Sequence, residues 1–205
     1  AARAATRGPS IRDRLVAFLP RYARHATRLR LLAQARDAIP ALARLSQFLT
    51  GFTATRPLPR WSRAPWRDDE ASLAEPDAIL FADTFNRWFE PENLRDAARV
   101  LRAGEYRVAA ASSSGRPLCC GRTFLAAGMV DRAREEARRT LAVLAPHARA
   151  GRPIIGLEPS CLLTLRDEWL SLGLGEEARA VADHALLFEE FIDRNAARFA
   201  AVLKP

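Results

Sequence analysis

The chain has 205 residues, of which 49% are hydrophobic and 27% are charged, and it carries a net charge of +8. This composition is typical of a folded globular protein and excludes a collagen-like, low-complexity or disordered chain. No segment approaches the roughly 18 uninterrupted apolar residues of a membrane-spanning helix, and the Arg-rich start lacks the apolar core and cleavage site of a secretory signal.

The positive charge is concentrated at the start of the chain. Residues 1–67 contain fourteen arginines but only Asp13 and Asp37 as acids, whereas acids outnumber bases in the remainder. Lys204 is the only lysine. Arginine in place of lysine, alongside abundant alanine, indicates a coding bias, which lowers the weight of the arginines as a functional signal.

Residues 1–52 are predicted to form a helical, basic arm. Pro20 and Pro40 mark breaks after which helix restarts, and Gly51 ends the last helix. Apolar residues recur at helical spacing in two stripes, Leu15, Phe18, Leu19 and Tyr22, then Ile39, Leu42, Leu45 and Leu49. The arm is expected to pack on its own protein; the alternative is contact with an anionic membrane face. Nucleic acid is not an expected partner, because no basic patch interleaved with aromatic residues is present.

Residues 53–77 are predicted to be an irregular, Pro-rich linker. Four prolines interrupt the segment, and Trp61 and Trp66 lie among arginines. We expect both tryptophans to anchor the linker on the surface of the following domain rather than to bind a ligand.

Residues 78–205 alternate between strand and helix patterns. Three short apolar runs predict strands, at 78–82, 106–111 and 153–157. Helices are expected at 91–102, after Gly121, at 130–149, after Glu158, at 176–187 and at 189–203. The predicted fold is therefore α/β, a short parallel sheet with crossover helices, preceded by the helical basic arm.

Three loops follow the predicted strands and are expected to meet at one edge of the sheet. Their sequences are Asp83-Thr84-Phe85, Cys119-Cys120-Gly121 and Glu158-Pro159-Ser160-Cys161. Sites in parallel sheets form at this carboxyl edge. All three cysteines fall at strand-to-helix junctions, where a helix N-terminus would lower the pKa of a thiol or stabilise an anionic cluster.

The residues alone leave the role of the cysteines open. Their spacing matches neither a zinc knuckle nor a close-spaced ferredoxin motif. A cysteine nucleophile would need a nearby histidine, and His25, His147 and His184 lie on predicted helices away from the strand ends. The alternative is that all three are small buried residues in a reducing compartment.

Other polar segments are weaker candidates. Residues 112–116 (SSSGR) lack the lysine and spacing of a phosphate-binding loop, so a plain loop is favoured. Arg122 would either offset the charge of a thiolate or pair with an acid. Residues 132–139, which include Glu135 and Glu136, are predicted to form a solvated helix face.

Three segments in this order resemble the cysteine-rich CCG domain at the C-terminal end of FAD- and iron–sulfur-containing D-2-hydroxyacid dehydrogenases. They are 81–91 (FADTFNRWFEP), 119–122 (CCGR) and 156–161 (GLEPSC). The resemblance covers roughly residues 10–203, and the family includes enzymes acting on D-lactate, D-2-hydroxyglutarate and glycolate.

The resemblance implies an iron–sulfur cluster or metal bound by Cys119, Cys120 and Cys161. Asp83 and Glu158 stand where the family pattern has further cysteines, and carboxylates can serve as substitute ligands. A zinc-binding interaction domain is a further alternative. FAD and ferredoxin-like domains are expected upstream and a second repeat downstream, and a chain that opens with Ala1 and has Met129 as its only methionine agrees with a piece of a larger enzyme.

The function implied by the resemblance is that of a fragment of a flavin/iron–sulfur oxidoreductase. This module would bind or shield a redox centre and pass electrons to an acceptor, without being catalytic alone. Its expected partners are the flavin and ferredoxin-like domains of the parent protein. The expected location is the cytoplasm, with association at the inner membrane face as an addition. The rival is a non-catalytic scaffold with a degenerate metal site that docks through the basic arm, at a membrane in one version.

Overall fold

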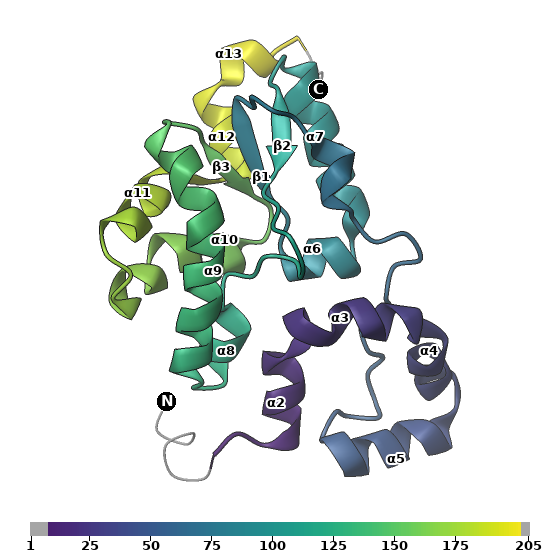
Figure 1. Cartoon of the computed structure of the whole chain (residues 1–205). Coiled ribbons are helices and arrows are strands. Elements are labelled where there is room, and N and C mark those ends of the chain that lie inside the picture. Colours follow the sequence, from purple (N-terminus) through teal and green to yellow (C-terminus); the bar gives the residue numbers. More distant parts are fainter. Residues whose placement is uncertain (1–7, 202–205) are drawn as a thin grey trace.

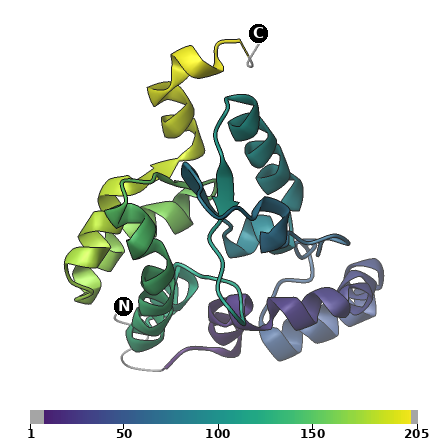
Figure 2. The ribbon, with the colours of Figure 1, turned by 45° about the horizontal axis from the view of Figure 1, so that its top comes forward.

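The computed structural model of the chain describes residues 8–201 and shows a helical arm beside an α/β domain (Figure 1). The α/β class predicted from the sequence is confirmed, because the sheet is wholly parallel and helices connect its strands. The arm and the last two helices lie at opposite ends of the molecule (Figure 2). Within residues 8–201, no helix combines the length and the apolar character needed to cross a membrane.

The sheet has four strands in the order β2-β1-β3-β4. The strands are β1 (Ala78–Phe81), β2 (Val108–Ala110), β3 (Ile154–Gly156) and β4 (Ala185–Leu187). Residues on β1 alternate between the two faces, as the pleat requires: Ile79 and Phe81 join one core cluster and Leu80 the other. Both faces of the sheet are therefore buried, which is the usual state of a parallel sheet.

Helices cover each face of the sheet. The helices of the domain are α6 (Thr84–Trp88), α7 (Pro91–Ala103), α8 (Arg122–Ala126), α9 (Val130–Arg149), α10 (Pro159–Arg166), α11 (Glu176–His184), α12 (Phe188–Arg194) and α13 (Ala196–Phe199), with 3-10 turns η1 (Asp68–Ala71) and η2 (Glu168–Leu172). One core contains buried side chains of α9, α10 and α11, together with Cys120 and Cys161. The opposite core contains side chains of α7, α12 and α13.

Two sequence predictions in this domain are wrong. The helix expected over 176–187 ends at His184, and the apolar residues Ala185 to Leu187 instead pair with β3 as a fourth strand. Three apolar residues cannot be assigned to helix or strand from periodicity, so the sequence pattern does not indicate this strand. The helix expected over 189–203 is broken at Asn195 into α12 and α13, and its predicted end lies outside the described residues.

In its described part, residues 8–52, the arm has four short helices, α2 (Ile11–Ala17), α3 (Leu19–Arg28), α4 (Arg30–Ala38) and α5 (Pro40–Thr50). Pro20 and Pro40 lie in the first turns of α3 and α5, and Gly51 ends α5 with a left-handed φ of 78°, all as predicted. The arm begins to pack on the domain at Ala17, whose carbonyl accepts a hydrogen bond from the Thr123 hydroxyl at 2.9 Å.

Residues 53–77 form the expected irregular connection, apart from η1. Trp66 is buried in the core beside α7, and the ring of Trp61 lies 4.4 Å from that of Phe89. Both tryptophans attach this segment to the domain, but Trp66 does so from within the core and not, as the sequence predicted, on the surface.

We predict that Ile155→Ala lowers the free energy of unfolding by about 2–5 kcal/mol, because Ile155 is fully buried in β3 and the substitution leaves a cavity. Urea unfolding followed by circular dichroism measures the change. Leu163→Ala, at an exposed position of α10, is the control and should change stability by less than about 1 kcal/mol. Equal losses in the two variants would contradict the packing described above.

Candidate functional site

The carboxyl edge of the sheet brings together the loops that contain all three cysteines. Cys119 and Cys120 end the connection from β2 to α8, and Cys161 lies in the first turn of α10, just after β3. Cys120 affects the pKa of both Cys119 and Cys161, so the three thiols lie near one another. The Cys119 and Cys120 sulfurs also accept hydrogen bonds from the Gly121 and Arg122 backbone N–H groups, each at 3.4 Å.

The thiols are free and buried, and their surroundings disfavour the thiolate. Cys119, Cys120 and Cys161 are 4%, 2% and 5% exposed. The pKa of Cys119 is raised well above its usual value by the hydrogen bond with Cys120 and by burial. At Cys120 the hydrogen bond with Cys119 lowers the pKa, but the hydrogen bond with Cys161 and burial outweigh it, so the pKa is again well raised.

The pKa of Cys161 is also raised. Its hydrogen bond with Cys120 lowers the pKa of Cys161. Burial and the nearby carboxylates of Asp83 and Glu158 raise this pKa by more, so the net shift is upward. The expectation that helix N-termini would lower the thiol pKa values is therefore wrong. Interactions among the thiols and burial outweigh the hydrogen bonds that Cys119 and Cys120 accept from the Gly121 and Arg122 N–H groups, which lower the pKa.

Polar side chains from neighbouring elements fix the Cys119–Cys120 backbone. The Thr140 hydroxyl on α9 accepts from the Cys119 N–H at 3.3 Å and donates to the Cys119 carbonyl at 2.8 Å. The Trp169 indole N–H donates to the Cys120 carbonyl at 2.8 Å. Because each bond is buried, the loop is held in one conformation.

Gly121 completes the turn that begins α8. Its φ is 89°, a region that other residues rarely adopt, and an added Cβ would lie 2.9 Å from the carbonyl oxygen of Ala133. The glycine of the Cys-Cys-Gly sequence is thus required by backbone shape and by the close approach of α9.

Asp83 and Glu158 lie at the same edge, but both carboxylates cap helices. Asp83 accepts from the Phe85 and Asn86 backbone N–H groups at 2.8 and 3.0 Å, and from the Asn86 side-chain amide at 2.7 Å. Burial raises the pKa of Asp83, although these hydrogen bonds lower it. Glu158 accepts from the Ser160 N–H at 3.3 Å and hydroxyl at 2.7 Å.

The donor set suits a soft metal or an iron–sulfur cluster only in part. Thiols are the right ligand type, and the fold brings three of them together. The two carboxylates are already engaged, and within residues 8–201 no group of three or more His, Cys, Asp or Glu side chains, the three cysteines included, has an arrangement that could hold a metal ion. To hold a centre that ordinarily takes four protein ligands, the three thiols would have to move and a further ligand would have to be supplied.

The histidines lie on helices, as the sequence predicted. They are His25 on α3, His147 on α9 and His184 on α11. The Nδ1 of His147 contacts Arg152, and the Nδ1 of His184 contacts the carbonyl of Ala180. Neither contact supports a Cys–His nucleophilic pair.

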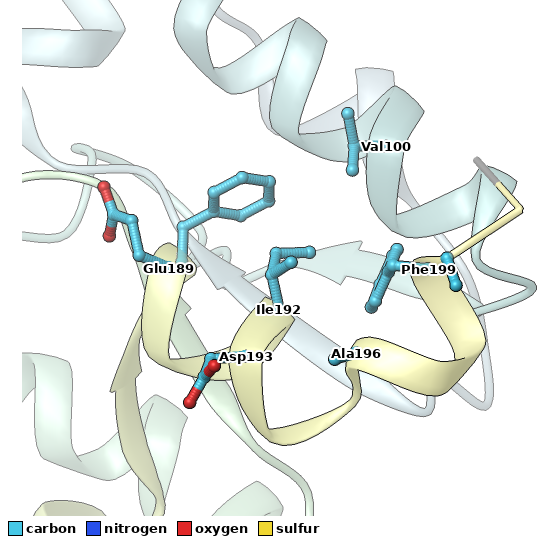
Figure 3. Close-up of a pocket in the computed structure, with 8 residues that line it drawn as sticks. Val100, Glu189, Ile192, Asp193, Ala196 and Phe199 are labelled. Atoms are coloured by element: carbon cyan, nitrogen blue, oxygen red, sulfur yellow. The ribbon is translucent and has the colours of Figure 1, made fainter. Parts of the chain in front are cut away.

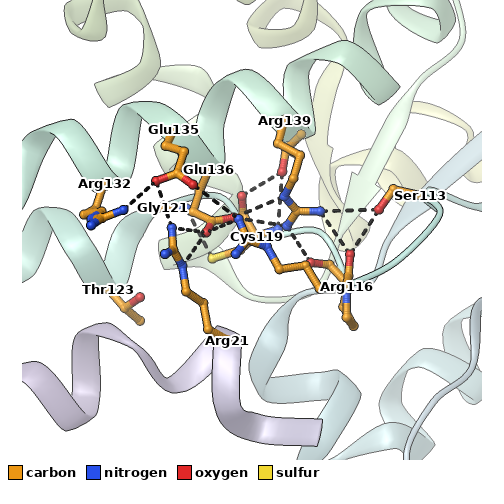
Figure 4. Close-up of polar contacts among 12 residues, drawn as sticks. Arg21, Ser113, Arg116, Cys119, Gly121, Thr123, Arg132, Glu135, Glu136 and Arg139 are labelled. Atoms are coloured by element: carbon orange, nitrogen blue, oxygen red, sulfur yellow. Dashed lines mark hydrogen bonds and ion pairs between the residues drawn. The ribbon is translucent and has the colours of Figure 1, made fainter.

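Glu136 is a residue whose importance sequence reasoning missed. The predicted solvated helix face is wrong at this position, because the Glu136 side chain is only 1% exposed whereas that of Glu135 is 48% exposed. Its carboxylate pairs with Arg21 at 2.9 Å, Arg116 at 2.8 Å and Arg139 at 3.0 Å (Figure 4). The available signal was that Glu136 falls between Ala133 and Thr140 in the buried stripe of α9.

The Glu136 network connects the arm, the cysteine loop and α9. Arg21 belongs to α3, and Arg139 also donates to the carbonyl oxygens of Arg116 and Pro117, at 3.0 and 2.6 Å. These carbonyls belong to the segment that leads to Cys119. The predicted plain loop at 112–116 agrees with this arrangement, since its Ser113 hydroxyl donates to the Arg116 carbonyl (Figure 4). Arg122 pairs with Glu168, one of its two expected roles.

An apolar groove of about 580 Å³ lies between α7 and α12–α13. Val100, Ile192 and Phe199 line it, and Glu189 and Asp193 lie at its border (Figure 3). It belongs to the face of the sheet opposite the core that contains Cys120 and Cys161. The groove is therefore separate from the cysteine edge.

Comparisons with protein-family models, curated proteins and solved structures found no match to this chain.

We predict that Glu136→Gln lowers the free energy of unfolding by about 2–4 kcal/mol, because it leaves three arginines without their shared carboxylate. The expected loss of stability is smaller than for a fully buried ion pair, because the arginines are partly exposed. Urea unfolding measures the loss. Glu135→Gln is the matched control, and its cost should not exceed about 1 kcal/mol. A Glu136→Gln variant as stable as the control would show that the network contributes little.

We predict slow reaction of the thiols with Ellman's reagent in the folded protein. Buried thiols with raised pKa values contain little thiolate at pH 8, so labelling should be at least about tenfold slower than in concentrated urea. Reaction followed by absorbance should reach three thiols per chain only after unfolding. Equally fast labelling in the native protein would contradict the burial of the cysteines.

Proposed function

We propose that this chain is the cysteine-rich module of a flavin- and iron–sulfur-dependent oxidoreductase acting on a D-2-hydroxyacid, and that it contributes thiol ligands to a redox centre. The observation that carries the proposal is the meeting of Cys119, Cys120 and Cys161, from two loops, at the carboxyl edge of a parallel sheet. The substrate class rests on the resemblance of the segments at 81–91, 119–122 and 156–161.

In this proposal Cys119, Cys120 and Cys161 hold the centre, and a further ligand comes from another part of the parent protein. A bound iron–sulfur cluster supplies one-electron transfer. The residues of this chain exclude water and fix the ligand loops: Thr140 and Trp169 hold the backbone, and burial keeps solvent from the sulfurs. Removal of hydride from the hydroxyacid is assigned to the flavin domain and not to this module.

The partners in the proposal are the flavin and ferredoxin-like domains of the parent protein and an electron acceptor. A cytoplasmic location fits free thiols, because a reducing compartment preserves them.

A non-catalytic scaffold is the second candidate, and a specific observation favours it. The thiols are buried with raised pKa values, while Asp83 and Glu158 serve as helix caps. A degenerate metal site retained for packing would have these properties.

We predict that anaerobically purified protein, supplied with iron and sulfide, binds iron and gains a broad visible absorption band. A Cys119→Ser, Cys120→Ser and Cys161→Ser triple variant should lose both, because it lacks the thiol ligands. Asp83→Asn is the control and should keep its iron, since Asp83 acts as a cap. Metal analysis and absorption spectra give the readout, and circular dichroism checks that each variant is folded.

Absence of iron in the folded wild-type chain would favour the scaffold. Zinc without iron, lost in the triple variant, would instead indicate a structural zinc site.

A further inference from the structure

The far part of the arm exposes an unusual amount of apolar surface. Of the fifteen large hydrophobic residues that are exposed within residues 8–201, eight lie between residues 29 and 49. Leu31 and Leu32 on α4 are each 69% exposed, and Phe48 on α5 is 87% exposed. Single exposed apolar residues are ordinary, but a concentration of this kind marks an interaction surface.

The exposed residues of α5 form one stripe. Leu42, Leu45 and Leu49 follow one another at steps of three and four, and Phe48 lies beside them. Ala43 is buried on the inner side of α5, the side that packs on the rest of the arm. The apolar stripe therefore points away from the protein, and α5 is an amphipathic helix with its apolar face outward.

The unpaired charge of α4 and α5 is positive. Arg28, Arg30 and Arg44 form no ion pair with any residue in the described range 8–201. The two acids of the arm are occupied: Asp13 accepts from the Ser10 N–H at 3.0 Å and from its hydroxyl, and Asp37 pairs with Arg36 and accepts from the Leu58 N–H at 3.0 Å. No free carboxylate offsets the arginines here.

We propose that the outer face of α4 and α5 binds the surface of an anionic lipid bilayer. Leucine and phenylalanine side chains enter the boundary between headgroups and acyl chains, while the arginines contact anionic headgroups. Exposed apolar side chains on helices that also carry the unpaired Arg30 and Arg44 match this surface in both polarity and charge. The proposal does not depend on whether the cysteines bind a redox centre.

Cosedimentation of the full chain with vesicles tests the proposal. Vesicles of equal parts phosphatidylglycerol and phosphatidylcholine should bind the protein, whereas phosphatidylcholine alone should not. Binding should weaken as sodium chloride is added, because salt screens the attraction.

Two variants separate the apolar and charged contributions. Leu45→Ser combined with Phe48→Ser should weaken binding about tenfold or more, since it removes inserted apolar surface. Arg44→Ser should weaken it about fivefold, the loss of one cation near the surface. Val130→Ser combined with Leu170→Ser removes two exposed apolar residues from the α/β domain and should leave binding unchanged.

Three results would overturn the proposal. They are equal binding to both kinds of vesicle, binding unaffected by the Leu45/Phe48 variant, and failure of the folded wild-type chain to bind either vesicle. If sedimentation equilibrium shows self-association that the Leu45/Phe48 variant abolishes, while vesicles are not bound, the face is instead an interface between two copies.

Discussion

A single buried carboxylate connects the main parts of this protein. Glu136 forms ion pairs with arginines of the arm, of the segment before the cysteines and of its own helix. A buried carboxylate is stable only when cations and hydrogen-bond donors compensate its lost hydration. The positions of α3, α9 and the loop leading to Cys119 are therefore mutually dependent. The Glu136 ion pairs, which lie outside the cysteine edge, thus help to position the loop that leads to Cys119.

At the cysteine edge, two kinds of polar group play different roles. The carboxylates of Asp83 and Glu158 satisfy the first N–H groups of helices, which is a structural task. The sulfurs of Cys119 and Cys120 accept only long bonds, each of 3.4 Å, from the Gly121 and Arg122 N–H groups at the start of α8. The edge thus combines rigid loops with three soft ligands. None of the structural contacts described at this edge requires these three residues to be cysteine. This contrast makes the thiols, and not the carboxylates, the centre of the functional proposal.

The sequence was informative where its signals were local. Pro20, Pro40 and Gly51 located the breaks of the arm, and apolar runs located three strands. It was misleading where tertiary contacts decide. Ala185–Leu187 became a strand only because β3 offers a free edge, and Glu136 became buried only because three arginines distant in sequence converge on it. The raised thiol pKa values likewise follow from contact between two loops, which no local pattern specifies.

The two outer strands of the sheet, β2 and β4, have three residues each. An outer strand presents unpaired N–H and C=O groups along its free side, and a strand of another molecule can add there. Strands this short offer too few such groups to template a lasting addition. The domain should consequently resist the edge-to-edge aggregation that threatens open sheets, although its sheet does not close into a barrel.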